Sequence, residues 1–106
     1  MDQQIRALLR DLKTGLKRLY GPRLREVLLY GSYARGEQDE ESDVDVLIVL
    51  DEVQRYGDEV DRTSILISEL SLKYAVTISR TFVSEGHWAA HGSSFLANVH
   101  EEAIPA

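Results

Sequence analysis

Two aspartates, Asp43 and Asp45, open the most apolar run of the chain, DVDVLIVL at residues 43–50. Side chains two apart on a strand point to one face, which sets their Cα atoms roughly 6.5 to 7 Å apart. Two carboxylates at that spacing can bracket one divalent ion, or two ions roughly 3.5 to 4 Å apart. Oxygen ligands suit Mg²⁺, which also takes water and substrate phosphate. An isolated pair of this kind is more often a solvated strand end, so it needs a second feature beside it.

The second feature is Gly31-Ser32, which follows the apolar run VLLY at residues 27–30. Glycine lets another group approach the backbone closely, and the serine hydroxyl beside free N–H groups at the start of a helical turn suits an anion. Arg35, one turn further on, could contact a phosphate or pair with the acidic stretch after it. Gly31, Ser32 and Arg35 are therefore the predicted phosphate-binding residues.

Two strands must bring these residues together. Residues 27–30 and 43–50 both have strand character, and the ten residues between Ser32 and Asp43 are too few for a parallel crossover. We therefore expect an antiparallel pair, with Gly31 and Ser32 at the end of one strand beside Asp43 and Asp45 at the start of the next.

The remaining elements complete an α/β pattern. Apolar residues at helical spacing predict helices over 2–19, with Asp2 as the cap, and over 54–72, where Ile65 and Leu66 widen the apolar side. Residues 74–83 alternate as in a strand, and Ser93 or Ser94 could cap a last short helix. This order predicts an α/β fold with a small mixed sheet flanked by helices, in a single domain over residues 1–106.

Composition and charge exclude several classes of protein. The chain of 106 residues contains no cysteine, which excludes a disulfide scaffold, thiolate metal sites and thiol catalysis. It has no long apolar run and no secretory signal, so we expect a soluble, cytoplasmic protein with no membrane partner. The net charge is −6, which disfavours general DNA binding. Acidic side chains are concentrated in residues 37–61; the default interpretation of such a run is a solvated face.

The two motifs together resemble the minimal nucleotidyltransferases of the DNA polymerase beta superfamily. The shared stretch reads LYGSYARGE, five residues, and then SDVDVLIV, and its core covers residues 27–50. Both the length of the chain and the order of its elements agree with a nucleotidyltransferase-like two-layer fold.

The resemblance implies transfer of a nucleotide, with AMP expected, from ATP or another NTP to an acceptor hydroxyl. By position, Gly31 and Ser32 would hold the triphosphate, while Asp43 and Asp45 would bind Mg²⁺ and be the catalytic residues. The chain has no room for a domain that holds the acceptor, so the acceptor would be a macromolecular partner. In the family such domains are found beside small helical HEPN proteins. They act as antitoxins of these proteins, either by adenylylating them or by binding them.

One departure from the family leaves two other functions open. Catalytically strong members add a third carboxylate from a neighbouring strand, whereas residues 74–83 contain no Asp or Glu and offer Ala75, Thr77 and Ser79. A hydroxyl is a poor substitute as a metal ligand, and nothing in the sequence argues for Glu69 or Glu85. The first alternative is therefore a catalytically weak or inactive antitoxin that acts by protein–protein binding. The second is a sensor that binds ATP without turnover.

Other features have less specific interpretations. His87 and His91 have a spacing seen in zinc sites, but with no third ligand identified we expect surface or core roles, and nothing places His100 near them. Trp88 and Phe95 are expected in the core or at a subunit contact. The basic face of the first helix could meet RNA or an acidic partner, although such faces are usually only solvated. An open edge of the small sheet would allow a homodimer.

Overall fold

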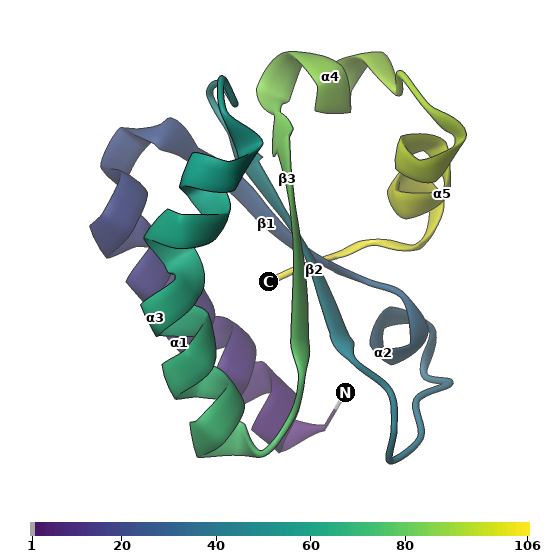
Figure 1. Ribbon diagram of the computed structural model, residues 1–106. Coiled ribbons are helices and arrows are strands. Elements are labelled where there is room, and N and C mark those ends of the chain that lie inside the picture. The colour runs from purple at the N-terminus through teal and green to yellow at the C-terminus, as the bar shows by residue number, and fades with distance from the viewer. Residues whose placement is uncertain (1) are drawn as a thin grey trace.

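The computed structural model describes residues 2–106 and contains helices and strands in alternation (Figure 1). In chain order they are α1 (Gln3–Tyr20), the 3₁₀ turn η1 (Gly21–Arg23), β1 (Leu24–Tyr30), α2 (Ser32–Arg35), β2 (Val44–Leu50), α3 (Tyr56–Tyr74), β3 (Ile78–Ser84), α4 (Glu85–Ala90), α5 (Ser94–Glu102) and β4 (Ile104–Pro105).

The four strands form one mixed sheet in the order β3-β2-β1-β4. β1 and β2 are antiparallel, with Leu29 opposite Val46 and Tyr30 opposite Asp45. β3 lies parallel to β2, to which α3 connects it, and β4 pairs antiparallel with β1 at Leu28 and Leu29. The predicted antiparallel first pair and the helical crossover to a parallel third strand are both confirmed. The two-residue strand β4 was not predicted, because two residues are too few to show alternation.

The two faces of β2 pack against different helices. Val44, Val46, Ile48 and Leu50 are fully buried and belong to the larger core, which lies between the sheet and the paired helices α1 and α3 (Figure 1). On the opposite face, Leu47 and Val49 join a smaller core under α5, together with Leu28, Leu96 and Val99. The predicted α/β arrangement of a small mixed sheet flanked by helices is confirmed.

Local chemistry explains where the helices begin and end. The Asp2 side chain caps α1 by accepting a hydrogen bond from the Gln4 N–H at 2.7 Å, and Gly21 ends the helix at a φ of 56°. Ser93 caps α5 in the same way through the Leu96 N–H, and Ser84 caps α4 through the His87 N–H. The predicted caps at Asp2 and Ser93 are confirmed, whereas α4 was predicted only as a break in the chain.

Two details of α3 and β3 differ from the prediction. The helix continues to Tyr74 and ends at Ala75, which adopts a left-handed conformation (φ 54°), so the strand begins at Ile78 rather than at residue 74. Ile65 was predicted to widen the buried side of the helix, but 75% of its surface is exposed. The period of the helix turns this position toward solvent, away from Ile67 and Leu70, which are buried.

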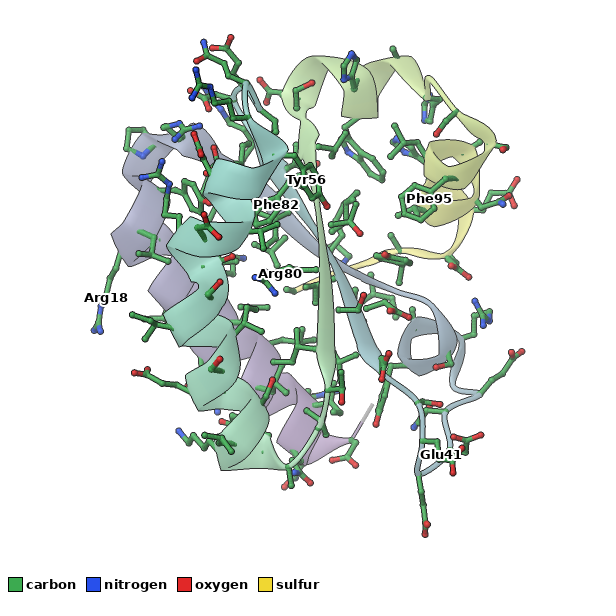
Figure 2. The ribbon with its side chains drawn as sticks, viewed as in Figure 1. Arg18, Glu41, Tyr56, Arg80, Phe82 and Phe95 are labelled. Carbon is green, nitrogen blue, oxygen red and sulfur yellow. The ribbon has the colours of Figure 1, made fainter. Side chains whose placement is uncertain are left out.

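Arg80 ties β3 to α3 through hydrogen bonds rather than through an ion pair. Its guanidinium points from the strand toward the helix (Figure 2) and donates to Thr63 Oγ1 at 2.8 Å and to the Val60 carbonyl at 2.9 Å. On the same face of β3, Phe82 packs edge to face against Tyr56, with ring centroids 5.6 Å apart. These contacts hold the crossover helix on the sheet and fix the position of β3 beside β2.

In the part of the chain that the structure describes, no helix combines the length and the apolar character needed to cross a bilayer.

Candidate active site

Asp45 is the second residue of β2, an inner strand, so it lies close to the edge of the sheet at which that strand begins. Its register partners are Tyr30 on β1 and Ser79 on β3, so strands flank it on both sides. Val44 and Val46, on either side of it in the chain, are fully buried in the larger core. The backbone around Asp45 is therefore held by packing on one face of the sheet, while the carboxylate stands on the other face. Asp43 precedes the strand by one residue, on the side of the acidic loop.

The surroundings of the Asp45 carboxylate disfavour its negative charge and therefore favour a cation beside it. The pKa of Asp45 lies above its ordinary value, chiefly because burial disfavours the charged form and next because the Asp43 carboxylate repels it. The Arg35 guanidinium opposes this rise only in part, and the Glu102 carboxylate adds to it. A half-buried carboxylate with a second one beside it has the chemistry of a hard-cation ligand set, so the donors fit Mg²⁺.

Gly31 brings the predicted phosphate-binding turn against Asp45. It caps α2 at a φ of 78°, and a Cβ atom built at this position would collide with Asp45 Oδ2. Its carbonyl accepts hydrogen bonds from the Ala34 and Arg35 N–H groups, which folds the backbone of Ser32 into the short helix. The structure therefore brings Gly31 and Ser32 to the same edge of the sheet as Asp43 and Asp45, as the sequence predicted.

Arg35 is engaged by two carboxylates. Its Nε donates to Glu37 at 3.1 Å and its Nη1 donates to Glu102 at 2.8 Å. The pairing with Glu37 is one of the two roles that the sequence suggested. Glu102 is the residue that sequence reasoning missed: it lies 67 positions from Arg35, at the end of α5, and no motif marks it. The packing of α5 and the register of β4 beside β1 bring it to the site.

The strand next to Asp45 supplies no third acid. Ser79 is the register partner of Asp45 on β3, and Thr81, two residues on, binds the Tyr30 hydroxyl at 3.2 Å. Glu85 pairs with Arg25 instead, at 3.9 Å, and Glu69 is exposed on α3. Among residues 2–106, no group of three or more His, Cys, Asp or Glu side chains is arranged to hold a metal ion.

Two of the three histidines, His91 and His100, lie together beside Trp88. His100 stacks on Trp88 with ring centroids 3.5 Å apart and also contacts His91 at 3.6 Å, although nothing in the sequence placed it near them. Its Nε2 lies 2.8 Å from the Trp88 carbonyl oxygen. Phe95, on the same helix as His100, packs edge to face against Tyr30 (Figure 2). These contacts join α4, α5 and the sheet. Trp88 packs against the smaller core, as one of its two predicted roles requires, whereas Phe95 is 43% exposed and lies outside the core.

The basic face of α1 borders a groove of about 510 Å³ along the helix, closed on its other side by Pro105 and Ala106. Arg6, Arg10, Lys13 and Lys17 line it. Lys13 Nζ donates to the Ala106 carbonyl at 3.1 Å, which holds the end of β4 against the helix. Neither Gly31 nor the two aspartates line this groove.

The family described as "Nucleotidyltransferase domain" matches residues 9–98, which include Gly31, Ser32, Asp43 and Asp45. This chain belongs to the nucleotidyltransferase domain family. A relative from Methanocaldococcus jannaschii, called "Putative protein adenylyltransferase MJ0604", is 39% identical over 101 residues, which cover 89% of each chain.

Solved structures agree on the fold of this nucleotidyltransferase. A crystal structure described as "a putative nucleotidyltransferase from Sulfolobus solfataricus" superposes with a TM-score of 0.61 at 23% identity, over 96% of this chain and 80% of the other. A second crystal structure, described as a toxin-antitoxin with AMP-PNP, gives a TM-score of 0.54 at 21% identity, over 97% of this chain and 69% of the other. At these identities the likeness concerns the fold. The family match identifies the chain as a nucleotidyltransferase whose motif residues lie at one edge of the sheet.

Proposed function

We propose that this nucleotidyltransferase transfers AMP from ATP to a hydroxyl of a protein partner, with Mg²⁺ held by Asp43 and Asp45. The observation that carries the proposal is the meeting of the Asp43–Asp45 pair with the turn at Gly31, in a chain of this family. The name of the M. jannaschii relative, a protein adenylyltransferase, supports AMP as the group and protein as the acceptor. Because NTPs are made and used in the cytoplasm, we place the reaction there.

The residues of the site have two kinds of role: some bind the triphosphate or the metal, and others hold these binding residues in position. Gly31 and Ser32 offer a close backbone approach and a hydroxyl for the triphosphate, and Arg35 offers a guanidinium for one of its phosphates. Asp43 and Asp45 hold the metal, which when bound lowers the pKa of the acceptor hydroxyl and neutralises charge on the phosphates. The buried neighbours Val44 and Val46 keep Asp45 at a fixed distance from the turn.

The transfer itself is a single displacement at phosphorus. The acceptor oxygen forms a bond to the α-phosphorus, and the bond from that phosphorus to the oxygen bridging the α- and β-phosphates breaks. Pyrophosphate leaves with the electron pair of the broken bond, and the proton of the acceptor hydroxyl passes to water. The side chains of the site form no covalent intermediate, so they contribute orientation and charge.

For the acceptor we propose a small helical protein of the HEPN type, with this chain as its antitoxin. The fold likeness to a structure described as a toxin-antitoxin with AMP-PNP motivates this partner and agrees with ATP as the donor. A second candidate function is favoured by one observation, the hydroxyl of Ser79 at the register position beside Asp45 where a third acid would lie. In that case the chain neutralises its partner by binding alone and transfers AMP slowly or not at all.

Intact-mass spectrometry of the two proteins tests the proposal. The chain and its HEPN-type partner are incubated with Mg²⁺ and each NTP in turn. We expect the partner to gain the mass of one AMP with ATP, and the Asp43→Asn, Asp45→Asn double variant to give no gain. Glu41→Gln is the matched control, since it removes one exposed carboxylate from the same loop and should leave the gain intact. Neutralisation of the partner by the double variant, with no mass gain by either protein, would support the binding function instead.

A further inference from the structure

The Glu102 carboxylate, which lies outside the motif, reaches the Gly31 turn from the end of α5. Its Oε1 accepts a hydrogen bond from the Gly31 N–H at 3.2 Å, and its Oε2 accepts one from Arg35 Nη1 at 2.8 Å. Both oxygens of the carboxylate are therefore used at once, one on a backbone donor and one on a guanidinium. The pKa of Glu102 lies below its ordinary value, mainly because of the Arg35 contact. Each of these two donors belongs to the residues assigned above to the triphosphate.

The backbone around Glu102 is firmly held, so its position is built into the fold. Val99, one turn earlier on α5, is buried, and its carbonyl accepts a hydrogen bond from the Ala103 N–H at 2.8 Å. Immediately afterwards Ile104 pairs with Leu29 in the sheet, two residues before Gly31. The side chain itself is 24% exposed and retains room to turn. An incoming phosphate could displace the carboxylate without moving the helix.

We propose that the Glu102 carboxylate is an internal competitor of the nucleotide, bound to the Gly31 amide and the Arg35 guanidinium in place of a phosphate of ATP. This inference rests on the proposed function, because it takes these two groups as triphosphate ligands. A carboxylate resembles a phosphate in charge and in its ability to accept from two donors at once. Binding of the nucleotide then exchanges one anion for another, and Arg35 passes from Glu102 to the phosphate.

The contacts of Glu102 argue against its being the missing third metal ligand. A metal ligand turns its oxygens toward the other carboxylates of the set, whereas both Glu102 oxygens are committed to hydrogen-bond donors. Within residues 2–106, Asp43, Asp45 and Glu102 also do not form a group that could hold a metal ion. The two roles predict opposite effects of removing the charge. Loss of a competitor tightens nucleotide binding, and loss of a ligand weakens it.

The fraction of molecules in which Glu102 occupies the two donors determines how far its removal lowers the Kd of the nucleotide. If Glu102 occupies the two donors in about nine of ten molecules, the apparent Kd of the nucleotide is about ten times its intrinsic value. Replacing the carboxylate by an amide removes the charge that Arg35 attracts but nearly keeps the shape. We therefore expect Glu102→Gln to lower the Kd for ATP with Mg²⁺ by about tenfold.

Isothermal titration calorimetry on the full chain measures this change, with ATP and with inorganic tripolyphosphate as probes, both with Mg²⁺. Glu101→Gln is the matched control, since it removes the same charge one residue earlier, at an exposed position. Thermal melting of each variant checks that the chain is folded. Tighter binding of both probes to Glu102→Gln, with Glu101→Gln close to wild type, is the expected result. Tripolyphosphate carries no base, so a lower Kd for this probe would show that Glu102 competes with the phosphates of the nucleotide.

Three other results would overturn the inference. Equal Kd values for Glu102→Gln and wild type would show that the carboxylate does not compete, and weaker binding would make Glu102 a supporting group. If Glu101→Gln tightened nucleotide binding as much as Glu102→Gln, the change in net charge alone would explain the effect. In all three cases wild type binds ATP, so the result does not contradict the proposed function. If neither wild type nor either variant binds ATP, the proposed function fails and the inference falls with it.

Discussion

The carboxylates of Glu59, which is buried, and of Asp45, which is half-buried, have opposite electrostatic surroundings in one small protein. Glu59, on α3, is 4% exposed and accepts hydrogen bonds from the Tyr20 hydroxyl at 2.8 Å and from Arg62 Nε at 3.1 Å. Arg23 lies 3.5 Å from its other oxygen. Asp45 has buried neighbours as well, yet the titratable group with the largest effect on its pKa is another carboxylate, that of Asp43.

The consequence appears in the direction of the two pKa values. Burial alone would raise both, but the donors around Glu59 more than offset it, so its pKa lies below the ordinary value. For Asp45 burial and Asp43 act together, and its pKa lies above the ordinary value. The difference teaches that a carboxylate satisfied by its own protein is part of the structure, whereas one left unsatisfied is available to a ligand.

The largest effect is expected at Glu59. Glu59→Gln leaves Arg23 and Arg62 without their shared carboxylate and weakens the bond from the Tyr20 hydroxyl, so we expect a loss of about 2 kcal/mol in the free energy of unfolding at neutral pH. Urea denaturation followed by circular dichroism measures it. Glu69→Gln, at an exposed position on the same helix, is the control and should stay within about 0.5 kcal/mol of wild type. A Glu59 variant as stable as wild type would remove the contrast with Asp45.

A smaller effect of opposite sign is expected at Asp45. Asp45→Asn removes a charge that burial and Asp43 disfavour, so without metal we expect a melting temperature equal to or above that of wild type. Addition of Mg²⁺ in the millimolar range should then raise the melting temperature of wild type and leave that of the variant unchanged, because a ligand stabilises only the state that binds it. A marked loss of stability in metal-free Asp45→Asn would mean that this aspartate is structural after all.

The smallest effect concerns acid pH and tests the cause of the contrast. Because the pKa of Glu59 is lower in the folded chain than its ordinary 4.5, its stabilising contribution is complete above about pH 4.5 and is lost as the pH falls through the folded value. We expect Glu59→Gln to flatten this part of the curve of unfolding free energy against pH. Some acid dependence will remain, since the pKa values of Asp51 and Glu102 are lowered too. Parallel curves for variant and wild type between pH 3 and pH 5 would contradict the assignment.

Much of the fold follows from local patterns. The spacing of leucines on α1, the β-branched run of β2 and the short distance from Ser32 to Asp43 sufficed to predict the elements and the antiparallel first pair. These signals operate over a few residues. The strand β4 was not predicted because two residues are too few to show a period. Ile65 was predicted on the buried side of α3, but its residue type alone does not show whether an apolar side chain is buried.

The candidate site also combines residues that local sequence patterns predicted with residues that only the tertiary structure brings in. Gly31, Ser32, Asp43 and Asp45 lie within fifteen residues on adjacent elements, so their meeting could be predicted from the chain itself. Glu102 could not, because its place depends on how α5 packs and on the register of β4 with β1. The residues around Glu59 were also missed, since Tyr20 and Arg62 are 42 positions apart and meet only when α1 and α3 pack together.

The pairing of β4 with β1 also bears on the order in which the molecule assembles. β1 and β2 are joined by a short connection, whereas Pro105 must find Leu28 across most of the chain. The entropy lost in closing a loop grows with its length, so local pairs form more readily than distant ones. We therefore expect the turn at Gly31 and the aspartates to come together early in folding, and the end of the chain to dock last. A refolding molecule would then form the Gly31 turn and its contact with Asp45 before Glu102 reaches them.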